Sequence, residues 1–199
     1  TEDGESHEVD CIIFATGFKS NDLMWPIDII GKNSKSIREI WGDTPNAYKG
    51  ISVPEFPNMF CLYGPNTNIV HGGSIIYQVE CQINYIMQCL AEMLANELDE
   101  LDVKSSVNET YNQQVQEISS QLAWGHEKVD SWYKNANGRV VNNSPFSLQK
   151  YWELTRFTLS LERVSYQLLS TIKRLPKTGK FGMQCSMYCG FVSPSVASM

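Results

Sequence analysis

Residues 59–94 read MFCLYGPNTNIVHGGSIIYQVECQINYIMQCLAEML, and this stretch decides the fold class. The apolar run from Met59 to Tyr63 predicts a buried strand, which the Gly64-Pro65 pair ends. After a polar loop, apolar residues recur at three- and four-residue steps, which predicts an amphipathic helix over about 74–98 with Ser74 as its N-cap. We expect the apolar stripe of this helix to be buried by packing. The stripe comprises Ile75, Val79, Ile83, Ile86, Leu90 and Leu94.

The remaining sequence adds a second strand and shorter elements. Residues 9–15, VDCIIFA, form an apolar run that stops at Thr16-Gly17 and predicts a strand buried on both faces. Helices are expected from about 108 to 122 and over 148–158, and hairpins over 27–41 and 132–141. This order of elements predicts an α/β fold. The two strands should be neighbours or near neighbours in one sheet, with Gly17 and Gly64 at the same crevice.

Composition excludes several classes of protein. The 199 residues include 16 Lys and Arg against 22 Asp and Glu, a formal charge of -6 without a dense basic run, which argues against nucleic acid as a partner. No apolar run reaches the roughly 18 residues of a membrane span, and no signal peptide is recognisable, so we expect a cytoplasmic protein with reduced thiols. Cys11, Cys61, Cys81 and Cys89 should be buried, and Cys185 with Cys189 makes a poor zinc site. Because the chain begins with Thr1 and enters strand-like sequence at once, we expect its natural start to lie upstream.

The loop NTNIVHGGS (66–74) is the main candidate for ligand binding. In α/β folds a helix N-terminus at the sheet edge offers unpaired N–H groups and about half a positive charge to an anionic ligand. A loop of small residues also lets the backbone approach a flat or phosphorylated ligand. The alternative is a simple connector between a strand and a helix.

Four sequence blocks resemble one family when they are taken in order. They are DCIIFATGF (10–18), GISVPEFPNMFCLYGPNTN (50–68), SWYKNANGRVVNN (131–143) and LQKYWELTRF (148–157). Together they resemble the C-terminal third of class B flavoprotein monooxygenases, specifically Baeyer–Villiger monooxygenases related to cyclohexanone monooxygenase. The resemblance implies an FAD/NAD(P)-binding fold of two dinucleotide-binding domains, incomplete as it stands. It also implies FAD and NADPH as cofactors, a C4a-peroxyflavin, and insertion of one oxygen atom of O₂ into a ketone or onto a soft heteroatom of a small organic substrate.

The resemblance also assigns cofactor-binding positions. Residues 1–157 would be the C-terminal part of the FAD-binding domain, with the return from the NADPH domain near 8–22. Ala15, Thr16 and Gly17 would line the junction between the two cofactors. The loop that starts the long helix would face the pyrimidine edge of the flavin, where helix N–H groups stabilise negative charge. Its residues are Gly64, Pro65, Asn66, Thr67 and Asn68, of which Thr67 and Asn68 are the expected direct contacts.

Other family features have no counterpart in the sequence. There is no GxGxxG segment to hold a dinucleotide pyrophosphate, no FxGxxxHxxxW signature, and no arginine in the context of the catalytic one, so no catalytic residue is assigned. Ser34 and Glu55 each replace a glycine usual in the family, and residues 158–199 continue as an unassigned tail that could be disordered. We therefore expect a cofactor-site fragment that does not catalyse alone.

Two rival functions remain open. His71-Gly72-Gly73-Ser74 is similar to an esterase oxyanion loop, although the sequence has no GxSxG nucleophile elbow. The other rival is a truncated, non-catalytic interaction piece, whose long helix would expose an apolar face. In either case His126 should cap or pack a loop beside Trp124, whereas Trp132 and Tyr133 are expected in the core.

Overall fold

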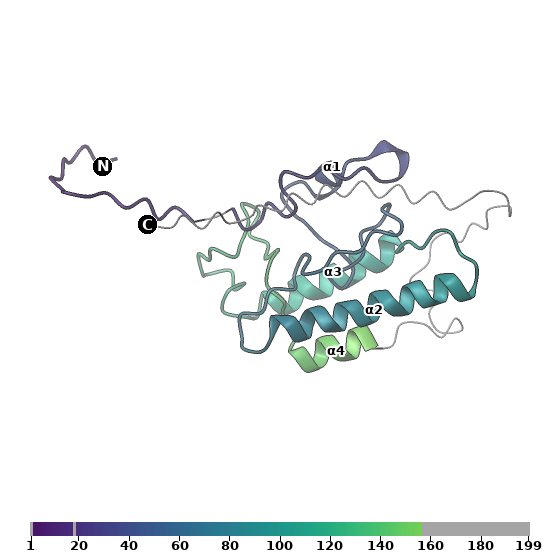
Figure 1. Ribbon diagram of the computed structural model, residues 1–199. Coiled ribbons are helices and arrows are strands. Elements are labelled where there is room, and N and C mark those ends of the chain that lie inside the picture. Colours follow the sequence, from purple (N-terminus) through teal and green to yellow (C-terminus); the bar gives the residue numbers. More distant parts are fainter. Residues whose placement is uncertain (1, 18, 157–199) are drawn as a thin grey trace, which may run out of the picture.

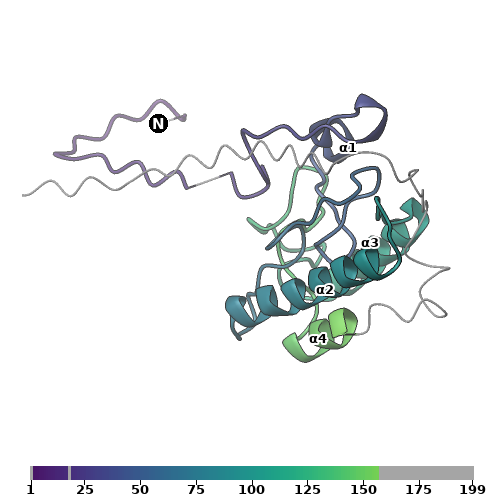
Figure 2. The same ribbon diagram turned by 45° about the vertical axis from the view of Figure 1, so that its right-hand side comes forward.

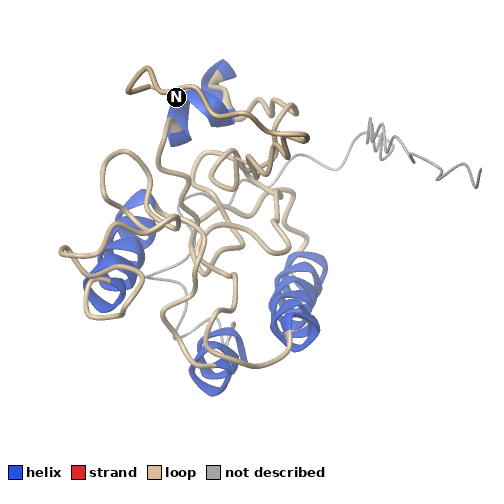
Figure 3. Cartoon of the chain, turned by 90° about the vertical axis from the view of Figure 1, so that its left-hand side faces the viewer, coloured by secondary structure: helices blue, strands red, loops and turns tan. Residues whose placement is uncertain are grey.

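The computed structural model describes residues 2–17 and 19–156. Over these residues the chain forms a 3-10 turn η1 (Lys32–Ser34) and four α-helices. Figure 3 shows the helices at the periphery and loops in the centre. Helices α2 and α4 pack side by side. The helices are α1 (Ile37–Trp41), α2 (Ile75–Ala95), α3 (Ser105–Ser119) and α4 (Leu148–Arg156).

The predicted long helix is confirmed as α2. Ser74 caps it, because the Ser74 hydroxyl accepts a hydrogen bond from the Tyr77 N–H at 3.3 Å. The helix ends at Ala95, where the Asn96 side chain donates to the Glu92 carbonyl at 3.0 Å. The acidic residues that follow stay outside the helix, since negative charge is unfavourable at a helix C-terminus.

The predicted buried face of α2 is wrong at four of its six positions, whereas Val79 and Ile86 are half-buried and Ile86 packs against an apolar cluster. Leu94 is 77% exposed, and Ile75, Ile83 and Leu90 are exposed as well. The helix instead buries the face that carries two glutamines, whose amides find partners in the core: Gln78 donates to the Thr67 carbonyl and Gln82 to the Tyr151 hydroxyl. The buried residues of α2 are Gln78, Cys81, Gln82, Tyr85 and Cys89.

The strand predicted over residues 9–15 does not form. Ile13 and Phe14 are 84% and 83% exposed, and Figures 1 and 2 show this segment projecting away from the body of the molecule. A strand exists only in a ladder with a neighbour, and no other described segment pairs with this one. Gly17 therefore does not share a crevice with Gly64, although the residues that follow Gly17 reach it.

The strand predicted over 59–63 is also absent. The backbone N–H groups here bond to scattered partners: Cys61 to the Ile51 carbonyl at 2.8 Å and Tyr63 to the Gln82 side chain at 2.9 Å. Left-handed backbone at Asn58 and Tyr63, with φ of 60° and 56°, bounds the run at each end. In the described ranges the only β pairing is in isolated bridges, namely Ile30–Ser36, Tyr48–Ser52, Asn68–Asn143 and Lys134–Val140.

The two predicted hairpins are reduced to turns. The turn at Gly138 (φ 72°) is present, but the two sides of the turn pair only through a single bridge between Lys134 and Val140. In the region 27–41, one bridge encloses η1, and the expected second strand is instead helix α1, because Ser36 and Glu39 form a capping box. Helix α3 begins at Ser105 and ends at Ser119, three residues before each predicted bound. The helix predicted over 148–158 is confirmed as α4 up to Arg156, and the tail lies outside the described residues.

Three apolar clusters hold the body together. Tyr85 and Cys89 of α2 pack on one cluster, Trp41 of α1 on a second, and Val115 of α3 on a third. Cys61, Cys81 and Cys89 are buried as predicted, and burial raises the pKa of the Cys61 thiol to about 12. Cys11 is exposed, contrary to prediction, because its segment leaves the body. Among the described helices, none is long and apolar enough to cross a membrane.

Candidate functional site

The loop Gly64–Asn68 lies against residues 140–144. The Asn66 N–H donates to the Val141 carbonyl and the Asn68 N–H to the Asn142 carbonyl, both at 2.9 Å. Ser144 returns a bond from its N–H to the Asn68 carbonyl at 2.8 Å. These bonds fix the backbone of the loop against a segment that is more than seventy residues away in sequence.

Side chains of the loop are used mostly within the protein. The buried Asn66 amide donates to the Val140 carbonyl at 2.9 Å and to the Asn143 carbonyl at 3.1 Å. Thr67 is 0% exposed, and its hydroxyl donates to the Gly64 carbonyl at 2.7 Å. Asn68 is half-buried, and its amide donates to the Asn143 side chain at 2.8 Å. A direct contact to a ligand is therefore open to Gly64 and Asn68, whereas Thr67 shapes the loop from beneath.

Two glycines permit this packing. Gly50 has a φ of 69°, and a Cβ atom there would lie 2.2 Å from Cγ2 of Thr67. A Cβ atom on Gly64 would lie 2.3 Å from the Gly50 carbonyl oxygen. The loop and the turn at Gly50 can approach this closely only because neither position carries a side chain.

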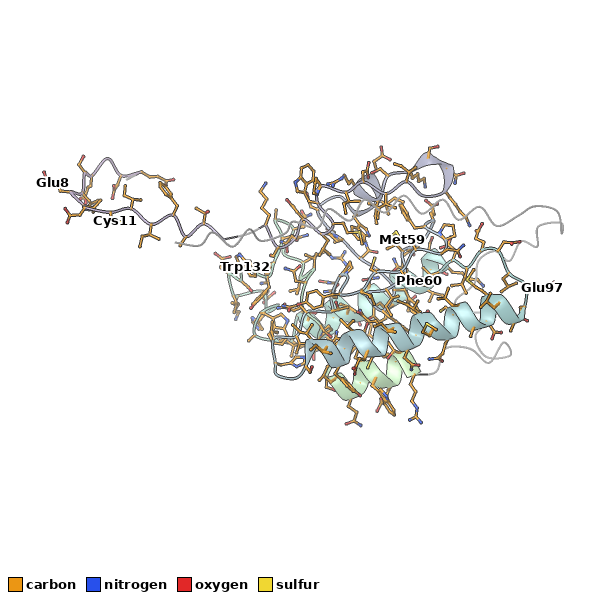
Figure 4. All side chains as sticks on the ribbon, viewed as in Figure 1. Glu8, Cys11, Met59, Phe60, Glu97 and Trp132 are labelled. Atoms are coloured by element: carbon orange, nitrogen blue, oxygen red, sulfur yellow. The ribbon has the colours of Figure 1, made fainter. Side chains whose placement is uncertain are left out.

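A cavity of about 210 Å³ lies beside the loop. Gly64 and Asn68 form one wall, and Trp132 lines the cavity from a distant part of the chain. Figure 4 shows Trp132 on the side of the body from which the segment carrying Glu8 and Cys11 projects. The volume suits the edge of a ring system and falls below the roughly 300 Å³ at which pockets for whole drug-sized ligands begin. Its lining residues are Ser20, Leu23, Tyr63, Gly64, Asn68, Trp132 and Asn142.

The predicted positions divide into two groups. Gly64 to Asn68 form one loop beside the cavity, with Pro65, Asn66 and Thr67 buried beneath it. Ala15, Thr16 and Gly17 are exposed, and no atom lies within 4 Å of a Cβ atom built on Gly17. The structure thus does not bring the two groups together. The segment that follows, Ser20 to Leu23, supplies the wall that residues 15–17 were expected to supply.

Sequence reasoning missed several cavity residues. Trp132, expected in the core, is 64% exposed and packs edge-to-face on Tyr133 at 5.3 Å between ring centroids. Tyr63 donates its hydroxyl to the Asn68 side chain, although its position in an apparent strand hid this role. The doubled asparagine that follows the turn at Gly138 was the available signal for Asn142, because a carboxamide can both donate and accept hydrogen bonds.

Electrostatics near the loop come from a helix end and from a buried amine. Residues 69–74 connect the loop to α2, whose N-terminus at Ile75 is the positive end of the helix dipole. Lys49, next to Gly50, is almost fully buried, with its amine 4.6 Å from the centre of the Tyr85 ring and 5.0 Å from that of Tyr48. Burial lowers the pKa of Lys49 to about 8.

The esterase-like segment is a plain surface loop. His71 is exposed, and its ring lies 6.0 Å from that of Trp124. Nδ1 of His126 accepts a bond from the Lys128 N–H at 3.2 Å, so His126 caps a loop beside Trp124 as predicted. Within the described ranges no three His, Cys, Asp or Glu side chains form a group that could hold a metal ion.

Known proteins resemble this chain in sequence and in structure. It is 39% identical over 155 residues to an uncharacterized monooxygenase, y4iD, of Sinorhizobium fredii, covering 77% of this chain and 23% of that protein. A Baeyer–Villiger monooxygenase of Pseudomonas aeruginosa is 36% identical over 169 residues, covering 84% of this chain and 31% of that protein. No protein-family model matches the chain.

Solved structures give the same result. A variant of cyclohexanone monooxygenase from Rhodococcus sp. Phi1 bound to NADP+ matches with a TM-score of 0.65 and 27% identity over 85% of this chain and 31% of that one. A closed structure of cyclohexanone monooxygenase matches with a TM-score of 0.67 and 25% identity over 87% of this chain and 32% of that one. The resemblance and the fold class predicted from four sequence blocks are therefore confirmed. The chain spans about a quarter to a third of the length of these proteins.

Proposed function

We propose that this chain forms one wall of the cofactor site in an FAD- and NADPH-dependent monooxygenase, because its sequence and fold are those of part of the Baeyer–Villiger monooxygenases. In this proposal residues 1–157 are the C-terminal part of the FAD-binding domain, as the sequence blocks predict. The complete protein inserts one oxygen atom of O₂ into a ketone or onto a soft heteroatom of an organic substrate. FAD, when bound, supplies the activation of O₂, and NADPH supplies the electrons.

One observation carries the proposal: Gly64 and Asn68 line a cavity, and residues 69–74 connect their loop to the N-terminus of α2, which Ser74 caps. A flat, electron-rich ring edge fits such a place, because backbone N–H groups and the helix dipole stabilise negative charge. Gly64 contributes backbone atoms alone to the wall of this cavity. Asn68 offers a half-buried amide at the same wall.

The residues present fit part of the cofactor and not all of it. The cavity of about 210 Å³ holds a ring edge, and the sequence contains no GxGxxG turn for a pyrophosphate. Each lost charge-assisted hydrogen bond costs roughly 1.5 to 3 kcal/mol, so three of them weaken binding by at least about a thousandfold. We therefore expect residues 1–199 alone to bind neither FAD nor NADPH usefully and not to turn over.

A titration tests this expectation directly. FAD is added to the purified 199-residue chain while flavin fluorescence is followed, and the same is done with a longer protein that includes a dinucleotide-binding domain upstream of Thr1. Binding by the longer protein alone supports the proposal. Tight, saturable quenching by the 199-residue chain contradicts its fragment part, and failure of the longer protein to bind FAD contradicts the cofactor assignment itself.

A non-catalytic interaction piece is the second candidate, favoured by the exposed apolar stripe of α2 and by the exposed residues of the N-terminal segment. Clustered apolar surface usually marks a contact with another protein or domain. Oxygenated product formed by the longer protein with NADPH and ketones would contradict this candidate. NADPH oxidation without an oxygenated product would leave an oxidase.

A further inference from the structure

Asn142 and Asn143 join three distant segments of the candidate site. The Asn143 side chain contacts the loop Gly64–Asn68, and the Asn142 side chain contacts the segment Ser20–Leu23. We infer that these two residues are positioning residues that set the two walls of the cavity relative to each other. This inference rests on the proposed function, because it identifies what holds the cofactor edge in place.

Asn143 fixes the loop from the inside. It is 0% exposed, its side-chain oxygen accepts from the Asn68 amide at 2.8 Å, and its carbonyl accepts from the Asn66 amide at 3.1 Å. The backbones of Asn68 and Asn143 also form a parallel bridge. Both asparagines of the loop are thus held by one residue, and Asn68 is the one that lines the cavity.

The Asn142 side chain bonds to a different segment from that of Asn143. Its amide donates to the Ser20 hydroxyl and to the Asn21 side-chain oxygen, both at 3.0 Å. These bonds link the body to Ser20 and Asn21, and Leu23 adds a packing contact with an apolar cluster of the body. Because Asn142 also lines the cavity, it holds the Ser20–Leu23 wall at the place where that wall faces Gly64.

The contacts of the two side chains explain the division of roles. The Asn143 side chain bonds to the loop Gly64–Asn68 and the Asn142 side chain to Ser20 and Asn21, so two adjacent carboxamides serve two different segments. A carboxamide both donates and accepts: the Asn143 oxygen accepts from Asn68, and the Asn142 amide donates to Ser20 and Asn21. Replacement of one asparagine should therefore loosen one wall and leave the other in place.

Hydrogen exchange of the 199-residue chain tests this division without any flavin. In Asn143→Ala, exchange should rise about tenfold in peptides covering 64–68 and 140–144, and in Asn142→Ala only in peptides covering 19–25, since a lost bond of about 1.4 kcal/mol is tenfold in opening. Asn137→Ala, in the exposed turn of the same hairpin, is the matched control and should change neither. If Asn143→Ala unfolds the chain, Asn68→Ala removes the same side-chain bond from the more exposed partner, together with the bond from the Tyr63 hydroxyl. Equal exchange in wild type and both variants, or a uniform rise everywhere, would overturn the inference.

Flavin spectra of the longer protein then test the functional consequence. Both variants should shift the flavin reduction potential or its visible absorption maximum with FAD still stoichiometrically bound, whereas Asn137→Ala should not. Unchanged spectra and potentials in variants that show the exchange effect would overturn the positioning role. Failure of the wild-type longer protein to bind FAD would instead overturn the proposed function, and the exchange result would still decide the role of the two asparagines in the fold.

Discussion

The loop Gly64–Asn68 and the segment Ala15–Gly17 carry the two motifs predicted to face the cofactors, and the structure treats them differently. The loop is held by six backbone and side-chain bonds to residues 140–144. The segment is exposed along its length and continues an arm that leaves the body. The difference shows that a motif takes its geometry from the segments that bond to it. Of the two motifs, only the loop Gly64–Asn68 has such segments within the described residues.

The largest expected difference between the body and the arm comes from their phenylalanines. Phe56 is 3% exposed in the body, and Phe56→Ala should cost about 3 to 5 kcal/mol of unfolding free energy through a cavity in the core. Phe14, at 83% exposure, loses no packing when it becomes alanine, so we expect a cost below about 0.5 kcal/mol. Urea unfolding of both variants measures the two values, and equal costs would show that the arm packs on the body.

A glycine pair sharpens the same comparison. Gly50 and Gly17 have nearly the same left-handed backbone, with φ of 69° and 70°, but only Gly50 has close neighbours. Gly50→Ala should cost about 3 kcal/mol because it adds a clash with Thr67 to backbone strain, whereas Gly17→Ala should cost about 1 kcal/mol or less. Thermal unfolding distinguishes the two. A cost at Gly50 no larger than that at Gly17 would mean that the turn at Gly50 does not support the loop.

Lys49 gives the loop region a dependence on pH that the arm lacks. Burial lowers the pKa of Lys49 to about 8, below its unfolded value of roughly 10.4. Protonation therefore favours the unfolded state below pH 8, and this cost disappears as pH rises from about 8 to 10.4. Lys49→Met should stabilise the chain by about 2 to 3 kcal/mol at pH 7, and its advantage over wild type should shrink across that window. A constant advantage at all pH values would contradict the burial of the charged amine.

The smallest expected effect concerns the cap that links the loop to α2. Ser74→Ala removes the bond to the Tyr77 N–H and should cost about 1 kcal/mol, as N-cap losses do. Ser6→Ala, in the arm, should cost less than about 0.3 kcal/mol because it ends no helix. Circular dichroism during urea unfolding measures both, and an unchanged midpoint for Ser74→Ala would show that α2 does not depend on this cap.

Local signals explain which parts of the fold could be predicted. The capping serine, the apolar repeat of α2 and the Asn137-Gly138 turn act within a few residues, and these features appear where the sequence places them. The two strands could not be decided locally, because Ile13 and Cys61 need a neighbouring strand that the sequence of either segment does not contain. The isolated bridges show how little pairing each segment finds.

The site was predictable on one side only. Gly64 and Asn68 follow from the motif, and they line the cavity. Trp132 and Asn142 come from seventy residues away, and nothing in their own surroundings fixes the direction of their side chains. Ser20 and Leu23 replace residues 15–17 because the bonds from Asn142 begin at Ser20.

The two glutamines of α2 have a consequence for how this helix is set in the protein. A helix with apolar residues around much of its circumference can rotate about its axis at little cost in free energy, because one apolar face replaces another in the core. Gln78 and Gln82 remove that freedom, since any other rotation would leave their carboxamides in the core without the Thr67 carbonyl and the Tyr151 hydroxyl. The rotation of α2 about its axis is therefore fixed by Gln78 and Gln82, which lie one and two turns after its N-cap Ser74.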